Sequence, residues 1–297
     1  LSDYLLENGV LLRAGRNPGQ GGGSGVVEMI DWDGAVLWSH SVIETHGRQH
    51  HDIELLPNGN ILLIVWDNRT QEEVDQTGST TINNHLNSEQ IVEIQPDLIN
   101  GGATVVWEWK AWDHLIQDAD AEKNNYGVVS EHPEKIDINF LNHNNPDWLH
   151  FNGIDYNEEL DQIMISVRNF SEFWIIDHST TPDEAISNNG GTYGMGGDLL
   201  YRWGNPQAYK QGNENDRKLF KQHNAHWIAE GLPDAGKILL FNNQAGTPEN
   251  LNYSTVNSLV LPSNSSGDYD YAGESYLPID FDWTWQAQNP TDFYSNI

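Results

Sequence analysis

The sequence predicts an all-β fold in which small antiparallel sheets repeat as the blades of a propeller. Short apolar runs rich in Val, Ile and Trp are separated by Asn-Gly, Asp-Gly and Gly-Gly turns, the pattern of short antiparallel strands. Helical periodicity is weak along the whole chain. Trp-rich strands also recur at the end of four successive groups of strands. These observations place the chain among the all-β proteins.

Seven runs carry the strand signal most clearly. Each is short, β-branched or aromatic, and bounded by turn residues. In chain order they lie at 26–30, 35–38, 61–66, 104–109, 162–167, 173–176 and 237–241. The best helical candidate, residues 112–117, is too short to change the fold class.

A loose repeat groups these strands. Each unit passes from a polar or His-led strand, through an Asn-Gly or Asp-rich turn and an apolar strand, to a Trp-rich strand at 37–38, 107–109, 201–203 or 283–285. Radial repetition of such sheets leaves a central channel lined by the innermost strands. We therefore predict a propeller formed by a single domain over residues 1–297, with a plain β-sandwich as the alternative.

The units are longer than the ~45 residues of a simple propeller blade. The extra residues must therefore form insertions, and loops of this length often build or cover a site. The predicted insertions are 71–89, 112–148, 181–198 and 205–221.

The chain is strongly acidic. It carries 44 acidic and 14 basic side chains, a formal net charge of −30. This field repels nucleic-acid phosphates and anionic lipids at long range, so neither is expected as a partner. Most of the acidity is interpreted as a solvated surface. Because the chain has no Cys, disulfides, thiolate nucleophiles and cysteine zinc sites are excluded.

No apolar run approaches the ~18 residues of a membrane span, so membrane insertion is not expected. No signal peptide opens the sequence at Leu1. The sequence leaves homo-oligomerisation open.

Three histidines point to a functional site. His51, His150 and His223 each precede an apolar strand, at the same place in three successive units. Equivalent positions of propeller blades converge on the channel. Arg168 follows the strand after His150 and is expected to reach the same channel mouth.

Two chemistries fit this set of residues. Neutral imidazoles can hold zinc or copper, whereas imidazoles beside a guanidinium can bind an oxyanion. Arg168 favours the anion, because a guanidinium is repelled by a divalent cation. The neighbouring His226 is interpreted as structural, and His50 either as structural or as a support for the site residues from behind. The stretch 118–122 is acidic but lacks the full calcium-loop pattern, so it is interpreted as a solvated loop.

At these residues the chain resembles the bacterial arylsulfate sulfotransferases and their arylsulfotransferase-like relatives, especially a marine, environmental branch. The resemblance runs through most of the chain. It is carried by HHDIELLPNGN at 50–60, VVWEWKAWDHLIQD at 105–118, DWLHFNGIDYNEELDQIMISVR at 147–168, IIDHSTTPDEA at 175–185, GGDLLYRWGNPQAY at 196–209, and LFKQHNAHWI with KILLFNNQAG within 219–246.

The resemblance implies a six-bladed propeller with its active site in the central channel, and sulfuryl transfer from an aryl sulfate ester to a phenolic acceptor without a nucleotide donor. His223 would be the nucleophile and form a sulfohistidine, which is covalent, ping-pong catalysis. His51, His150 and Arg168 would bind the sulfate oxygens, with Asn152 added to the substrate-binding set. The resemblance implies no cofactor and no metal, and a periplasmic or secreted location.

The chain departs from the family pattern at two places. Asn224 stands where the family usually has Asp after its catalytic Gln-His, and Asn-Asn-Gln at 242–244 stands where the family usually has Asp-Asn-Gly in the next strand, so two carboxylates near the catalytic histidine are absent. Compared with the family, parts of the first and last blades are expected to be missing at the two ends. Two other functions stay open: a non-catalytic propeller that binds sulfated glycans or another partner, and a metalloenzyme with histidine ligands.

Overall fold

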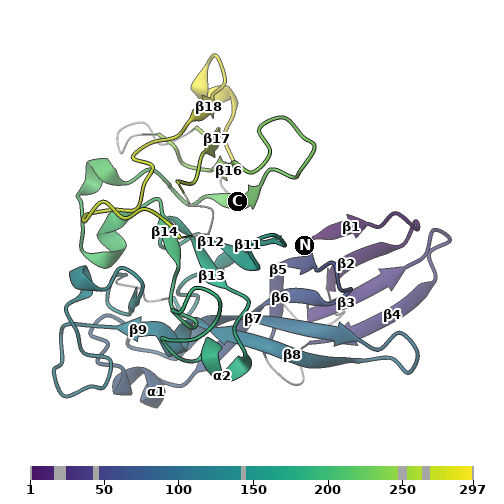
Figure 1. Cartoon of the computed structure of the whole chain (residues 1–297), viewed down its shortest axis with the longest axis horizontal. Helices are drawn as coiled ribbons and strands as arrows, with labels where there is room; N and C mark the ends of the chain where they lie inside the picture. The colour runs from purple at the N-terminus through teal and green to yellow at the C-terminus, as the bar shows by residue number, and fades with distance from the viewer. Residues whose placement is uncertain are drawn as a thin grey trace.

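The computed structural model describes residues 2–16, 25–42, 47–141, 145–246, 253–262 and 268–295. Within these residues the chain forms four antiparallel sheets of four strands, and each sheet uses four strands that are consecutive in the sequence (Figure 1). The all-β prediction is therefore confirmed. The six-bladed ring stays a prediction.

The first two sheets come from the N-terminal half. The first contains β1 (Asp3–Leu5), β2 (Leu11–Arg16), β3 (Gly25–Ile30) and β4 (Val36–Ser41). The second contains β5 (Gln49–Leu55), β6 (Ile61–Arg69), β7 (Leu86–Pro96) and β8 (Ala103–Lys110).

The other two sheets have the same order. The third contains β11 (Phe151–Asn157), β12 (Gln162–Val167), β13 (Glu172–Asp177) and β14 (Tyr201–Trp203). The fourth contains β15 (His223–Trp227), β16 (Ile238–Asn242), β17 (Thr255–Leu259) and β18 (Trp283–Trp285). All seven predicted runs fall in these sheets, and the four Trp-rich strands lie in β4, β8, β14 and β18, the last strand of each sheet.

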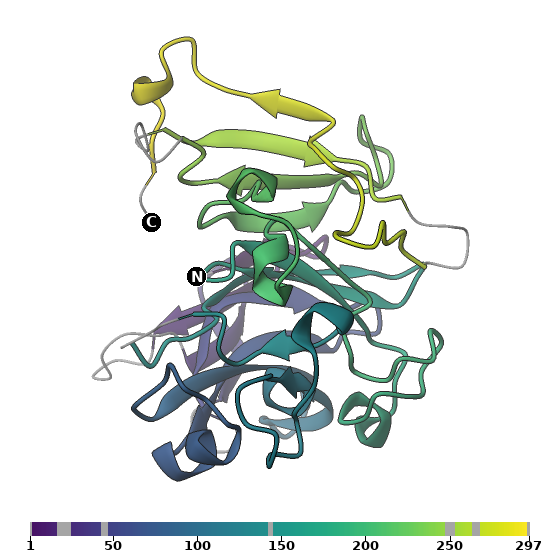
Figure 2. The ribbon, with the colours of Figure 1, turned by 90° about the vertical axis from the view of Figure 1, so that its left-hand side faces the viewer.

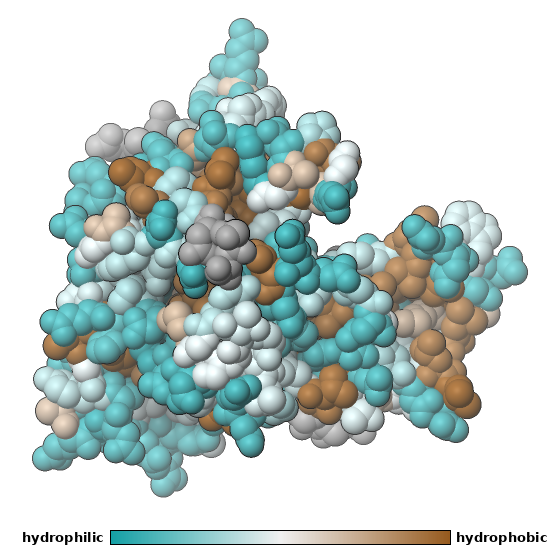
Figure 3. All heavy atoms as spheres, viewed as in Figure 1, coloured by the Kyte–Doolittle hydropathy of each residue, from teal (hydrophilic) through white to brown (hydrophobic). Residues whose placement is uncertain are grey.

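The sheets lie side by side, and the first strands of the second, third and fourth sheets are neighbours. Strand β11 packs between β5 and β15, and β5 also contacts β2 and β3 of the first sheet. The fourth sheet stacks above the third when the molecule is turned by 90° (Figure 2). The space-filling view shows a deep notch in the outline between the fourth sheet and the first (Figure 3). This arrangement favours the propeller over a two-layer sandwich, because sheets repeat around shared inner strands.

Apolar side chains fill the space between neighbouring sheets. Because successive residues of a strand point to opposite faces, strand β6 serves two cores at once. Leu62 and Ile64 join the core between the second and third sheets, whereas Leu63 and Val65 join the core between the first and second. Because such strands are buried on both faces, they appear in the sequence as continuous apolar runs and could be predicted from it.

The insertions contain the few helices and a short parallel pair of strands. The α-helices are α1 (Gln71–Gln76) and α2 (Pro182–Ala185), each opened by a Thr-Glu capping box, and β9 (Leu115–Ile116) pairs with β10 (Ile136–Asp137). Single 3₁₀ turns lie at Ala111–His114, Val129–Glu131, Pro206–Tyr209, Glu214–Asp216 and Pro290–Asp292.

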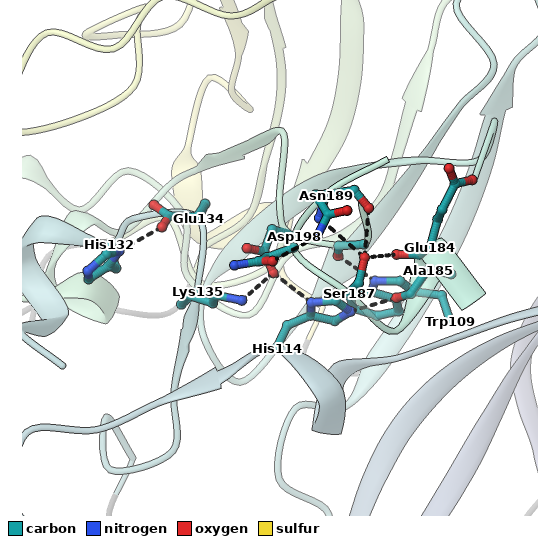
Figure 4. A network of polar contacts seen from close by, with 12 residues as sticks. Trp109, His114, His132, Glu134, Lys135, Glu184, Ala185, Ser187, Asn189 and Asp198 are labelled. Carbon is teal, nitrogen blue, oxygen red and sulfur yellow. Dashed lines mark hydrogen bonds and ion pairs between the residues drawn. The ribbon is translucent and has the colours of Figure 1, made fainter. Parts of the chain in front are cut away.

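The helix expected over 112–117 is wrong, because the segment forms one 3₁₀ turn followed by β9. His114 is the last residue of this turn, and its buried ring is held by residues distant in the sequence. Its Nδ1 lies 2.7 Å from Asp198 Oδ1 and its Nε2 lies 2.9 Å from the Ala185 carbonyl (Figure 4). Lys135 Nζ donates to the same Asp198 oxygen at 2.5 Å. These contacts fasten the 112–148 insertion to the 181–198 insertion.

Candidate active site

The ends of three inner strands meet at a cleft of about 800 Å³. Its walls bring together all five predicted site residues, His51, His150, Asn152, Arg168 and His223. Their roles in substrate binding and catalysis stay predictions. His50 lies behind the wall, and neither it nor His226 lines the cleft.

Irregular backbone at the start of each inner strand positions the histidines. The ladder shifts register between Gln49 and Ile53 in β5, between Phe151 and Gly153 in β11, and between His223 and His226 in β15. Bulges re-aim side chains and are common beside active sites.

The three histidines do not occupy identical positions in their strands. His51 lies within its bulge, His223 stands at the beginning of its bulge, and His150 precedes its strand by one residue. His51 and His150 have left-handed backbone, with φ of 55° and 57°. Such conformations are uncommon for residues other than glycine, so surrounding structure must hold them.

His223 is oriented by Asn243, which follows β16. Its Nδ1 lies 2.8 Å from Asn243 Oδ1 and 3.2 Å from the Lys221 carbonyl. Both atoms are acceptors, so Nδ1 carries the proton and Nε2 keeps its lone pair. Burial first, and then the charge of Arg168, lower the pKa of His223. A neutral imidazole with a free Nε2 lone pair is the form that can act as a nucleophile.

His150 has an acidic partner that sequence reasoning missed. Its Nδ1 lies 2.5 Å from Asp147 Oδ2. Burial alone would raise the pKa of Asp147, but the hydrogen bond and charge of His150 lower it below its usual range. Asp147 is therefore a carboxylate that fixes the Nδ1 proton of His150. Its position three residues before His150 is the only sequence signal that could have revealed it.

Two cations lie on the cleft wall, Arg168 and Lys221. Arg168 Nη1 donates to Asn169 Oδ1 at 3.1 Å, while its buried Nε has no hydrogen-bond partner among the described residues. Burial lowers the pKa of Lys221, and Arg168 and Arg217 lower it further. Sequence reasoning did not select Lys221. Both side chains offer donors to a bound anion.

Asn152 joins the third sheet to the fourth. Its Nδ2 donates to the Gln222 carbonyl at 2.9 Å, and its Oδ1 is buried without a hydrogen-bond partner among the described residues. An ideal Cβ placed on Gly153 would lie 3.4 Å from the backbone N and Cα of Asn224. At Gly153, β11 and β15 are therefore in close contact beside the cleft.

His51 contacts both the cleft and a buried pair of residues. Its ring centroid lies 4.7 Å from that of His150, and its Nδ1 lies 2.8 Å from Nδ1 of His50. His50 Nε2 in turn lies 2.8 Å from Glu89 Oε2, on β7. Burial lowers the pKa of His51 to about 3, helped by His50, His150 and His223. Sequence reasoning missed Glu89, because 39 residues separate it from His50.

The alternative of a histidine metal site gains no support from this geometry. No group of His, Asp or Glu side chains in the described part of the chain is arranged to hold a metal ion. In the acidic stretch 118–122, Asp118 accepts two hydrogen bonds from Lys210 Nζ, at 2.6 and 2.7 Å.

Across the residues that the structure covers, no helix is long and apolar enough to cross a membrane.

Repeated antiparallel sheets around a cleft lined by histidines and an arginine define a propeller-like protein. The profile of the arylsulfotransferase (ASST) family matches residues 19–272, and the chain belongs to this family. The finding confirms the family predicted from the sequence motifs; it does not address the marine branch.

Other comparisons add little. No curated protein matches the chain. Among solved structures, a Bacteroides fragilis protein assigned as a 6-phosphogluconolactonase is similar at 11% identity, with 93% of this chain and 55% of that chain covered and a TM-score of 0.38. The chain thus spans about half the length of that structure, and a likeness of this size carries no argument about function.

Proposed function

We propose that the cleft transfers a sulfuryl group from an aryl sulfate ester to a phenolic acceptor, through a sulfohistidine at His223. The observation that carries the proposal is the state of His223: Asn243 binds its Nδ1, and its Nε2 lone pair remains free in a cleft lined by Arg168 and Lys221. Membership of the arylsulfotransferase family supports the reaction class.

The first half-reaction follows from these contacts. Nε2 of His223 attacks sulfur, the bond between sulfur and the aryl oxygen breaks, and the phenol departs with a proton from a neighbouring histidine. Arg168, Lys221 and the imidazole donors stabilise negative charge on the sulfuryl oxygens. In the second half-reaction an acceptor phenol attacks sulfur and loses its proton, and the bond from sulfur to His223 breaks.

The test is incubation with 4-nitrophenyl sulfate without acceptor, followed by measurement of nitrophenolate release and of the intact protein mass. We expect a burst of one equivalent and a sulfuryl adduct that added phenol removes. His223→Ala should abolish both. His226→Ala is the matched control, because His226 lies three residues further along β15 and does not line the cleft, and this variant should keep both.

A folded protein with neither burst nor adduct would overturn this proposal and favour a propeller that only binds sulfated glycans. We further propose, from the family resemblance, a six-bladed ring and a periplasmic or secreted location. Electron microscopy of the gene product and fractionation of the producing cells test these two points.

A further inference from the structure

His51 begins a chain of three titratable groups, and its two buried members, His50 and Glu89, have no part in the reaction proposed above. The chain runs from His51 Nδ1 to His50 Nδ1 over 2.8 Å, and from His50 Nε2 to Glu89 Oε2 over 2.8 Å. The other oxygen of Glu89 accepts from the Phe151 backbone N–H at 3.1 Å. His50 is 3% exposed and Glu89 is fully buried. The far end of the chain is therefore closed to solvent, whereas its near end lines the cleft.

The short contact between the two Nδ1 atoms restricts where the protons lie. Burial lowers the pKa of His50 and of His51 to about 3, so each imidazole carries a single proton. One Nδ1 must therefore donate to the other. If His51 donates, His50 Nε2 donates to an ionised Glu89, and His51 presents a lone pair to the cleft. If His50 donates, Glu89 must be protonated, and His51 presents an N–H.

The surroundings of Glu89 favour its protonated form. Among the described residues, the basic side chain that Glu89 contacts is His50, and His50 is neutral. An ionised Glu89 would therefore be a buried charge with no cation beside it, which is unfavourable. Burial raises the pKa of Glu89 well above its usual value, and the charges of Asp147 and Asp67 raise it further, opposed by the Phe151 N–H and by His150. Glu89 thus holds a proton, and His51 Nε2 carries an N–H.

We propose that Glu89 is a positioning residue whose carboxylic acid fixes His51 as a hydrogen-bond donor to the cleft and supplies, through His50, the proton that the departing phenol receives. This inference rests on the proposed sulfuryl transfer. It assigns one of the cleft histidines as the proton donor and gives that histidine a buried proton reservoir.

The step balances in atoms and charge. As sulfur bonds to His223, the electron pair of the broken S–O bond goes to the phenolic oxygen, which takes the proton of His51 Nε2. His51 Nδ1 takes a proton from His50 Nδ1, and His50 Nε2 takes the proton of Glu89. The negative charge of the donor ester ends on Glu89, where the Phe151 N–H and His50 Nε2–H stabilise it. Attack by an acceptor phenol reverses each transfer and reprotonates Glu89.

Glu89→Gln separates positioning from proton supply. The amide can donate to His50 Nε2 and accept from Phe151, as the carboxylic acid does, but it cannot release a proton. With 4-nitrophenyl sulfate, whose phenolate leaves unaided, we expect adduct formation to slow by less than about threefold, whereas with phenyl sulfate it should slow by about 100-fold or more. If Glu89 had only a structural role, its substitution would slow adduct formation equally with both donors, and that result would overturn the proposal.

Asp147→Asn is the matched carboxyl variant, since Asp147 contacts the other wall histidine, His150. If Asp147→Asn, and not Glu89→Gln, selectively slows phenyl sulfate, the proton comes from His150 and the proposal fails.

A measurement on the wild-type protein is independent of activity and of variant folding. Nitrogen-15 NMR of labelled histidines should show His51 protonated at Nε2 and His50 protonated at Nδ1, and infrared spectroscopy should show a buried carboxylic acid. A His51 protonated at Nδ1 would overturn the proposal. If the wild-type protein shows the expected tautomers but forms no adduct with 4-nitrophenyl sulfate, the relay exists and the proposed transferase function is what fails.

Discussion

At His223, the acceptor of the Nδ1 proton decides whether the other nitrogen can attack. Here the amide oxygen of Asn243 accepts that proton at 2.8 Å. An amide orients the ring without attracting a second proton to it. Asn243 therefore fixes the orientation of His223, while burial lowers the pKa of its imidazole and favours the neutral form.

Two substitutions of Asn243 test this account. Loss of one hydrogen bond of about 1 kcal/mol in Asn243→Ala should slow sulfuryl transfer by about fivefold to tenfold. Asn243→Asp should retain the orientation but raise the pKa of His223, so the acid limb of the pH–rate profile should move to higher pH. In the wild-type protein we expect that limb below the ordinary imidazole value of about 6.5, because burial lowers the pKa of His223.

The neighbouring Asn242 provides the control. It is buried, accepts from the Phe220 N–H and donates to the Lys218 carbonyl, without touching His223. Asn242→Ala should therefore lower the melting temperature and leave the pH–rate profile unchanged. An unaltered profile in Asn243→Asp would show that Asn243 does not control the protonation of His223.

Between elements, His178 joins the second sheet to the third. It follows β13, and its ring lies 2.6 Å from Asp161 Oδ1 and 3.0 Å from Glu93 Oε2 on β7. Burial alone would lower the pKa of His178, but hydrogen bonds and charges of both carboxylates raise it to about 9. A histidinium between two carboxylates therefore fastens these two sheets.

The shift predicts a pH dependence of stability. The pKa of His178 is about 9 in the folded protein and about 6.5 in the unfolded chain. Its contribution to the free energy of unfolding is therefore complete below pH 6.5 and is lost as the pH rises through 9. The difference between the two pKa values corresponds to a contribution of about 3 kcal/mol. Denaturant unfolding at several pH values should show this loss, and His178→Gln should flatten it. His132→Gln, at an exposed histidine that contacts Glu134, should leave the slope unchanged.

Strands buried on both faces could be predicted because their apolar runs are unbroken, as at 61–66 in β6 and 173–176 in β13. The sequence gives a weaker signal for β7 and β17, since both carry buried polar residues; Ser88, Glu89 and Gln90 all lie inside. The histidines and Arg168 could be assembled from repeat position and family motifs. Glu89 could not, because its contact with His50 depends on how β5 and β7 face each other in the folded sheet.

On the scale of the whole molecule, charge opposes the proposed substrate. The net charge is −30, and an aryl sulfate is an anion. Arg168 and Lys221 line the cleft, where their charges would meet the donor at contact distance and salt screens little. The acidic remainder acts at long range, where salt screens strongly. The electric field of the cleft cations attracts the anionic donor at short range, and that of the acidic surface repels it at long range. A change in ionic strength weakens the second more than the first and so distinguishes their effects.

We expect kcat/KM for 4-nitrophenyl sulfate to rise severalfold between about 10 and 150 mM sodium chloride, as the Debye length falls from about 30 to about 8 Å. The long-range repulsion of the anionic donor is screened first, while the contacts of Arg168 within the cleft persist. The KM of a neutral phenol acceptor is the internal control and should not follow this trend. If kcat/KM for the donor falls instead, cations at the cleft mouth outweigh the acidic surface, and Lys221→Gln should then abolish the salt dependence.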